Sequence, residues 1–255
     1  MNLPRGYLSY NQIRLYQNCP LKYYLTYVKE IQFPINDKVY LGIVFHAVLE
    51  DYFAKKIAGE EPEKFQIIDT FNDLFKSMEE DNPVVWDGPK GKIKDRGVAF
   101  TRYFLKEMAP TIEPLMTEKE LETVIPELDI KIKGIIDLVE QDFSITDFKT
   151  TTAKWSKSRI SNSLLQMVIY KYLFEKNFGD VNPNLLYRII YSKNAVGIRH
   201  QEVKIKGDDV DYERMLKIIG YVAENISNGV YYDNPSYMCG FCEYKDICQE
   251  HKKSL

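Results

Sequence analysis

The chain has 255 residues, of which 45% are hydrophobic and 28% are charged, and its formal net charge is −3. These values are typical of a soluble globular protein with a sizeable core, in one large domain or two small ones. The sequence contains no apolar run long enough to cross a bilayer, no signal-peptide core at its start and no Walker-type phosphate loop. We therefore expect a cytoplasmic protein with no membrane segment and no built-in motor.

The N-terminal region predicts two short helices separated by a proline. Ser9 is a candidate N-cap for a helix that runs through Tyr16, and Pro20 interrupts this helix. A second short helix is expected over Lys22–Val28, and Cys19 lies at the break between the two.

Gly42–Ala58 predicts a longer helix, which Gly59 terminates. His46 lies beside the apolar face of this helix. A single histidine on a helix is more often hydrogen-bonded within the structure than bound to a metal, so the residue alone does not indicate a site.

Two further helices are predicted over Lys64–Glu80 and Arg96–Met108, with a loop at residues 82–91 between them. Residues 60–112 would thus form a helical insert. Basic residues concentrate in one part of it, over Lys90–Lys106, where either a solvated face or a nucleic-acid contact is possible.

Gly134–Thr150 predicts two short strands joined by a turn at Glu140–Asp142, because β-branched and aromatic residues flank a polar break. Asp147 and Lys149 are two apart on the second strand and therefore share a face. A three-residue loop at 140–142 would place residue 137 opposite residue 145 and bring Asp137 to that same face. A two-residue loop would turn Asp137 away, and we predict the odd loop or an equivalent bulge.

Two carboxylates and an amine that converge in this way suit a divalent cation. Hard oxygen ligands favour Mg²⁺ or Mn²⁺, which can activate water and neutralise charge on a phosphate. A surface hairpin held by a salt bridge is the alternative for an isolated Asp-x-Lys pattern.

A helix is predicted from Ser161 or Ser163 through Phe178, which Gly179 ends. Gln166 and Tyr170 are four residues apart and share one face of it. The stretch before this helix carries basic residues and no acid, directly after the candidate metal site. We predict that three of its residues bind a DNA backbone, namely Lys154, Lys157 and Arg159.

The last third predicts a hairpin over Leu185–Lys193 and Gly197–Lys206 that extends the sheet. A final long helix is expected to start at Asp208 or Asp209 and to run through Asn228.

All four cysteines are placed for joint metal binding. Cys239, Cys242 and Cys248 cluster near the C-terminus, and Cys19 lies far upstream. In a cytosolic chain this pattern favours a metal over disulfides. Four thiolates suit either tetrahedral Zn²⁺ or a [4Fe–4S] cluster, and spacing alone does not separate the two.

Six sequence features occur together across residues 9–248: Cys19-Pro20, Gly42…His46, Gly134-Ile135-Ile136-Asp137, Asp147-Phe148-Lys149-Thr150, Gln166…Tyr170 and the three C-terminal cysteines. In this order they resemble the PD-(D/E)XK nuclease superfamily, in its RecB-like branch with an iron–sulfur cluster, which includes the CRISPR-associated RecB-like exonucleases and the AddB nuclease domain. The resemblance implies an α/β restriction-endonuclease-like core, in which a mixed central sheet is flanked by helices.

The resemblance also implies site residues. The metal ligands would be His46, Asp137, Asp147 and the backbone carbonyl of Phe148. Lys149 and Gln166 would position water or phosphate, and Tyr170 would approach DNA. The superfamily often has an acidic residue upstream of the first catalytic strand, and Glu118, Glu120, Glu122 and Glu127 all compete for that role.

The cysteines would hold a structural [4Fe–4S] cluster, with Zn²⁺ as the alternative, in a cysteine clasp formed by residues 9–28 and 229–255. The whole chain, residues 1–255, would be a single nuclease domain. The implied activity is metal-dependent hydrolysis of DNA, on single strands or duplex ends, with a possible protein partner in a recombination or CRISPR complex. A non-catalytic DNA-binding or assembly subunit with the same fold is the alternative, as is a zinc-stabilised protein with another phosphate-handling role.

Overall fold

The computed structural model describes residues 2–179, 181–207 and 210–253, and the chain divides into two compact units. Unit 1 comprises Met1–Phe33, Leu121–Gly134 and Asp211–Leu255, and unit 2 comprises Pro34–Glu120 and Ile135–Val210. In the described part of the chain, no helix is both long and apolar enough to span a membrane.

A mixed five-stranded sheet forms the centre of the fold, with strand order β3-β4-β5-β6-β7. β4 and β5 are antiparallel, β5 and β6 are parallel, and β6 and β7 are antiparallel. The predicted fold class, a mixed sheet flanked by helices, is confirmed. The strands are β3 (Pro114–Ile125), β4 (Ile130–Glu140), β5 (Ile145–Thr151), β6 (Leu185–Tyr191) and β7 (Arg199–Ile205).

The turn between β4 and β5 fixes how their side chains face. Glu140 N donates to Ser144 O at 2.9 Å, so the loop consists of residues 141–143, and Leu138 pairs with Thr146. The predicted odd loop length is confirmed, but its position is wrong by one residue. Residue 137 accordingly lies opposite residue 147 and not opposite residue 145.

The shift has a local cause. Phe143 adopts a left-handed backbone conformation with φ 63°, and the Asp142 carboxylate accepts hydrogen bonds from the backbone N–H and the hydroxyl of Ser144, both at 2.9 Å. The Asp142 side chain thus closes the turn one residue later than the polar break suggests.

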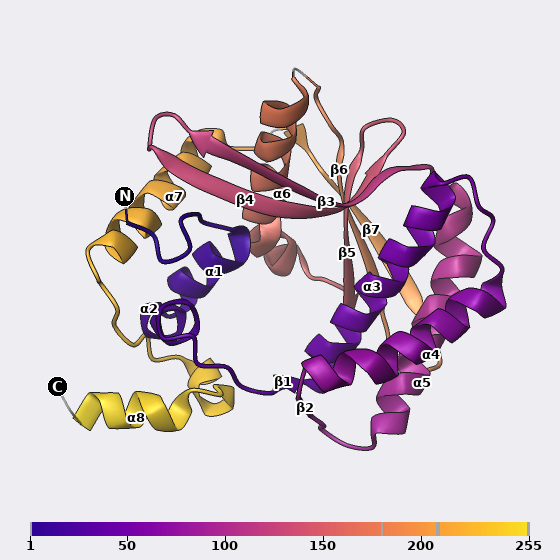
Figure 1. The fold of residues 1–255 in the computed structure, drawn as a ribbon, viewed down its shortest axis with the longest axis horizontal. Helices are drawn as coiled ribbons and strands as arrows, with labels where there is room; N and C mark the ends of the chain where they lie inside the picture. The colour runs from indigo at the N-terminus through magenta and orange to yellow at the C-terminus, as the bar shows by residue number, and fades with distance from the viewer. Residues whose placement is uncertain (1, 180, 208–209, 254–255) are drawn as a thin grey trace. The chain divides into compact units, whose positions relative to one another are not determined.

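Helices cover both faces of the sheet within unit 2. α3 (Asp37–Ile57), α4 (Lys64–Asp81) and α5 (Lys90–Tyr103) lie together beside β5 (Figure 1). α6 (Lys157–Phe178) contacts the other face, where Tyr187 O–H donates to the Ser163 carbonyl oxygen at 2.7 Å. Because consecutive residues of a strand point to opposite faces, Phe148 faces α3–α5 and Asp147 faces α6.

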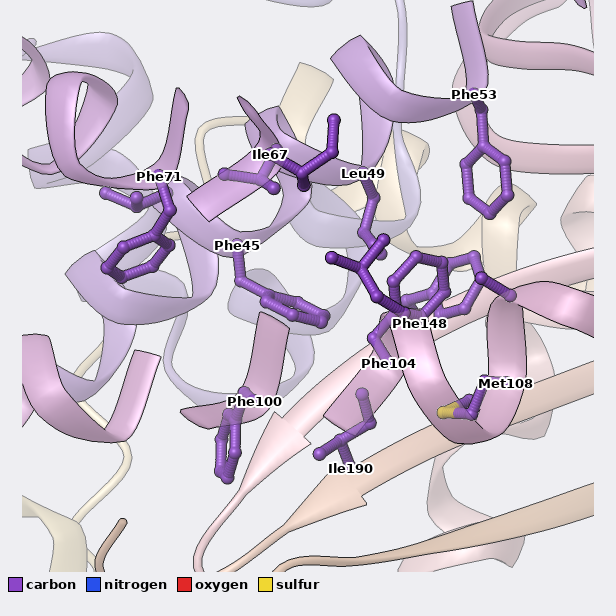
Figure 2. Close-up of a cluster of buried hydrophobic side chains, with 14 of the residues drawn as sticks. Phe45, Leu49, Phe53, Ile67, Phe71, Phe100, Phe104, Met108, Phe148 and Ile190 are labelled. Atoms are coloured by element: carbon purple, nitrogen blue, oxygen red, sulfur yellow. The ribbon is translucent and has the colours of Figure 1, made fainter. Parts of the chain in front are cut away.

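The core beneath α3 is built largely from aromatic rings (Figure 2). Phe148 of β5 stacks on Phe53 with ring centroids 5.8 Å apart, and Phe104 meets both rings edge-on. Gly97 lets α5 approach its neighbours, since a Cβ there would lie 2.1 Å from the Phe71 ring and 2.7 Å from Leu41.

Three predicted helix starts are wrong by five to seven residues. α3 begins at Asp37 because Asn36 Oδ1 accepts from two backbone N–H groups, and α5 begins at Lys90 directly after Pro89. α6 begins at Lys157, capped by Ser156, and neither Ser161 nor Ser163 is the cap.

The remaining elements of unit 2 are short. A 3₁₀ turn and a π-helical turn follow α5, and two residues on each side of α3–α4 form a small parallel ladder. They are η2 (Phe104–Met108), η3 (Ala109–Thr111), β1 (Ile35–Asn36) and β2 (Val84–Val85).

Unit 1 joins the two ends of the chain. α1 (Tyr10–Asn18) begins at the predicted cap Ser9 and contacts α7 (Tyr212–Ser227). The cap of α7 is Asp211, and the predicted caps Asp208 and Asp209 lie outside the described residues. The other elements of unit 1 are α2 (Pro20–Tyr23), η1 (Tyr24–Val28), η5 (Tyr237–Phe241) and α8 (Lys245–Lys253).

Candidate metal centre and cysteine pocket

α3 carries a histidine to the end of the β4–β5 pair. α3 passes close to β5 at Gly42, where a Cβ would make an ordinary contact with the Thr150 hydroxyl at 3.5 Å. One turn later, His46 Nδ1 lies 3.4 Å from Asp137 Oδ2. Burial, followed by the charge of Lys149, lowers the pKa of His46 to about 4, so the imidazole is neutral at pH 7 and retains a lone pair for a metal.

Asp137 and Asp147 face each other across the two strands. Asp137 Oδ2 accepts a hydrogen bond of 2.7 Å from the backbone N–H of Phe148. Burial raises the pKa of each aspartate to about 6, against the opposing effect of the Lys149 ammonium. The Asp137 and Asp147 carboxylates are both largely removed from solvent and repel each other, which favours a bound cation that would offset the cost of their charge.

Lys149 and Gln166 hold the two oxygens of Asp147. Lys149 Nζ lies 2.7 Å from Asp147 Oδ2, and Gln166 Nε2 donates to Asp147 Oδ1 at 2.8 Å. The same Gln166 nitrogen donates to the Tyr170 hydroxyl at 3.0 Å. Both amide hydrogens of Gln166 are therefore engaged, and this side chain orients Asp147.

The Tyr170 ring is buried, with 7% of its surface exposed. Burial and the nearby aspartates raise its pKa well above the usual range, so the hydroxyl keeps its proton. The structure thus places Tyr170 behind Gln166, as a support for the amide.

Glu118 is the glutamate that sequence patterns did not single out. Its ligand atom lies with those of His46 and Asp137 in a group whose atoms are all within 4.8 Å of one another. Its backbone has φ 44°, which interrupts the regular alternation of β3. Burial, then Asp137 and Glu50, raises the pKa of Glu118 to about 8.

The donor set fits a hard divalent cation. It combines one neutral imidazole, that of His46, with the carboxylates of Glu118 and Asp137, and the buried carboxylate of Asp147 lies on the neighbouring strand, paired with Lys149. Oxygen donors with one imidazole nitrogen suit Mg²⁺ or Mn²⁺ better than a thiophilic metal.

The predicted DNA-binding residues lie at and before the first turn of α6. Arg159 stacks over Trp155 at 4.7 Å, and its Nη1 donates to the Thr151 hydroxyl at 3.3 Å. Thr151 ends β5 two residues after Lys149, so Arg159 is tied to the strand of the metal centre. Lys154 and Lys157 are exposed.

The four cysteines line one pocket of about 210 Å³ within unit 1. Cys19 caps α2, Cys239 lies in η5, Cys242 follows η5 and Cys248 lies in α8. All four are free thiols, and the pocket floor includes Leu21, Leu25 and Tyr244. Four thiols that line one pocket are the type of donor that zinc and iron–sulfur clusters share.

Comparisons with known proteins cover nearly the whole chain. A model of the PD-(D/E)XK nuclease superfamily matches residues 7–249. The crystal structure of a candidate exonuclease from Eubacterium rectale is similar, with a TM-score of 0.63 and 13% identity over 96% of this chain and 88% of that one. The structure of a protein named SSO0001 aligns at a TM-score of 0.39 and 16% identity, over 93% and 94% of the two chains. No curated protein matches the chain.

Proposed function

The chain belongs to the PD-(D/E)XK nuclease superfamily, a family of metal-dependent nucleases, and on this premise we propose that it is a Mg²⁺- or Mn²⁺-dependent deoxyribonuclease acting on single strands or duplex ends. The observation that carries the proposal is the meeting of His46, Glu118 and Asp137 within 4.8 Å, next to Asp147 and Lys149. A surface salt bridge would not require three ligand-type side chains from α3, β3 and β4 to meet this closely.

The proposed ligands of the catalytic metal are His46, Asp137, Asp147, the backbone carbonyl of Phe148 and, in addition, Glu118. Such a metal supplies a Lewis acid that lowers the pKa of water and offsets phosphate charge. Neutral His46 presents a lone pair, and the Phe148 N–H holds the Asp137 carboxylate in orientation.

Lys149 is the proposed partner of the attacking water or of the scissile phosphate. Its ammonium is already fixed 2.7 Å from Asp147, so little side-chain entropy would be lost when substrate binds. Gln166 keeps Asp147 in place, and Tyr170 supports Gln166.

Lys154, Lys157 and Arg159 are proposed to hold the DNA backbone next to the cleaved bond. They surround the N-terminus of α6, where exposed cations and the helix dipole both favour phosphate. The hydrogen bond from Arg159 to Thr151, the last residue of β5, supports this placement.

We propose a [4Fe–4S] cluster in the cysteine pocket, with zinc as the alternative. One ligand from the N-terminal region and three from the C-terminal tail would join residues 9–28 to residues 229–255, and the group would be structural. Anaerobic purification, iron, sulfide and zinc analysis and a visible absorption spectrum test this; zinc without iron would reject the cluster.

At the scale of the whole chain, we propose one nuclease domain over residues 1–255 with residues 60–112 as its helical insert. The family model spans both compact units, which supports a single domain. Recombinational repair, CRISPR adaptation and phage DNA processing, with a protein partner, are the proposed settings.

The test is a nuclease assay on labelled single-stranded and duplex DNA with Mg²⁺, with Mn²⁺ and with EDTA. We expect Asp147→Ala to lower the rate by about 10³-fold or more, since it removes a ligand. The matched control is Asp73→Ala, an exposed carboxylate on α4, which should leave the rate unchanged. Equal residual activity in the wild type and Asp147→Ala would reject the enzyme and favour a non-catalytic DNA-binding subunit.

A further inference from the structure

A second cavity lies in unit 2, between the first turns of α4 and the end of α5. Its volume is about 430 Å³, within the range of small-ligand sites. Its lining has an apolar part (Phe65, Ile68, Leu105) and a charged part (Lys64, Arg102, Lys106, Asp69). None of these side chains belongs to the metal centre or to the α6 N-terminus.

The apolar part suits a flat ring. Leu105 is buried and forms a floor, whereas the Phe65 ring is 60% exposed at the rim. An exposed aromatic ring beside an open apolar cavity offers a stacking surface, and a base stacked on such a ring typically contributes strongly to single-strand binding. A metal or a purely polar ligand would make no use of this ring.

The charged part suits a phosphate. Three cations face one carboxylate in the lining. Lys106 is already paired with Glu107 at 2.8 Å, but the side chains of Lys64 and Arg102 make no ion pair or hydrogen bond with any residue in the described part of the chain. Lys64 is also the first residue of α4, where the helix dipole favours an anion.

We propose that this cavity binds one nucleotide unit of a nucleic acid, with its base on the Phe65 ring and its phosphate between Lys64 and Arg102. A paired base cannot reach a cavity, so the unit belongs to a single strand or is a free mononucleotide. The inference extends the proposed nuclease function by a strand-binding position on the helical insert, remote in sequence from the catalytic residues.

Binding is measured without hydrolysis, in EDTA, by fluorescence anisotropy with a labelled oligothymidylate, the matching duplex and competing thymidine monophosphate. We expect Phe65→Ala to weaken oligonucleotide binding about tenfold, and Phe65→Tyr, which keeps an aromatic ring, to bind with wild-type affinity. Lys64→Gln with Arg102→Gln should reduce the slope of log affinity against log salt by about 0.7 for each lost contact. Asp69→Asn should tighten binding.

Matched controls exclude general effects. Tyr221→Ala removes a ring that is 66% exposed on α7, and Lys217→Gln removes an exposed lysine of the same helix. Both should bind like the wild type. All four substituted pocket residues are exposed, so the variants should fold normally.

Hydrolysis separates this inference from the proposed function. With bis(p-nitrophenyl) phosphate, which is too small to use a distant base site, the pocket variants should retain wild-type kcat/KM, while KM for long single strands rises about tenfold. If the protein binds the oligonucleotide more tightly than thymidine monophosphate, the ligand of the cavity is a nucleotide within a single strand. If both bind equally, the ligand is a free mononucleotide released by hydrolysis.

The inference is overturned if the pocket variants bind the oligonucleotide with an affinity within twofold of the wild type. It is also overturned if an acidic peptide, but no nucleotide, displaces the labelled oligonucleotide. If the wild type hydrolyses no phosphodiester, the proposed function fails while the EDTA binding experiment still decides the pocket.

Discussion

The metal centre and the cysteine pocket differ in how far each is organised before any ligand binds. At the metal centre, strands and one helix fix the donors, and Asp147 is held by both Lys149 and Gln166. Around the cysteine pocket the thiols come from short helices and a loop, and Cys239 accepts one hydrogen bond, from Ser236 N at 3.3 Å.

This difference indicates that the donors of the candidate metal centre are held in place at a cost to folding stability, whereas the cysteine pocket would gain stability from a bound group. The candidate metal centre brings several acidic side chains together, and the packing of unit 2 must offset the cost of that arrangement. The cysteine pocket has weak internal support, so a bound group would supply part of the stability of unit 1. Four substitutions sharpen or break this contrast.

The largest effect is expected at the cysteines. Cys248→Ser should abolish binding of the metal group and lower the free energy of unfolding by about 3 kcal/mol or more, because the binding energy of such a group is also folding energy. The measurement is metal analysis with thermal unfolding. The control Met238→Ser alters an exposed neighbour in η5 and should change neither. Full stability without the group would contradict the contrast.

Gly97→Ala tests the scaffold of unit 2 without touching a donor. The new methyl group would overlap the Phe71 ring and Leu41, at a cost of about 1–3 kcal/mol in unfolding free energy. Gly91→Ala in the same helix meets no atom within 4 Å and should stabilise by about 0.5–1 kcal/mol. Chemical denaturation measures the free energy of unfolding of both variants. Equal changes in this free energy would show that α5 does not pack tightly against Phe71 and Leu41.

Gln166→Ala separates orientation from ligation. Loss of the hydrogen bond to Asp147 should lower kcat about tenfold with little change in KM. Gln166→Glu places a like charge beside Asp147, which raises the pKa of Asp147 further and moves the acidic limb of the pH–rate profile upward. Asn162→Ala, exposed on the same helix, is the control. If the pH–rate profile of Gln166→Glu is unshifted, Gln166 does not act on Asp147 during the reaction.

The smallest expected effect is the dependence of folding stability on pH. Without metal, the raised pKa values of Asp137, Asp147 and Glu118 mean that the folded state binds these protons more tightly than the unfolded state does. Their contribution to stability is present at low pH and is lost as pH rises through about 6 and then about 8. The lowered pKa of His46 acts oppositely between about 4 and 6.5, but one imidazole is outweighed by three carboxyls.

We therefore expect the metal-free Tm to fall by a few degrees between pH 5.5 and 8, and Mg²⁺ to recover it at pH 8 but not at pH 5.5. Asp147→Asn should flatten the dependence and remove part of the Mg²⁺ effect. Calorimetry with EDTA and with Mg²⁺ measures both. A Tm that rises with pH in EDTA would show that these carboxyls are not buried together.

Sequence patterns predicted several features of the fold, for different reasons. The cap Ser9 follows from neighbouring residues alone. The odd loop after β4 was inferred because it brings Asp137 to the face of Asp147, and the fold class was inferred from the resemblance of the six motifs to a known superfamily. The predicted caps of α6, Ser161 and Ser163, are wrong because four serines lie between residues 156 and 163, and only the tertiary structure shows that Ser156 Oγ accepts the hydrogen bond from Arg159 N.

Glu118 shows what local patterns cannot supply. Glu118, Glu120 and Glu122 share one face of a regular strand, so alternation does not distinguish them. The positive φ at Glu118 and its proximity to a histidine 72 positions earlier depend on tertiary structure. The pairing of residue 137 with residue 147 similarly depends on the Asp142 side chain.

The hydrogen bond from the Phe148 N–H to Asp137 has a consequence for how the centre can be monitored. The regular β4–β5 pairing extends as far as Leu138 and Thr146. Beyond that pair, the Asp137 carboxylate and not a backbone carbonyl accepts the hydrogen bond of the Phe148 N–H. Deuterium uptake at the single amide of Phe148 should therefore report the state of Asp137 directly. A cation drawing on that carboxylate would register there as a change in exchange rate, in the absence of any substrate.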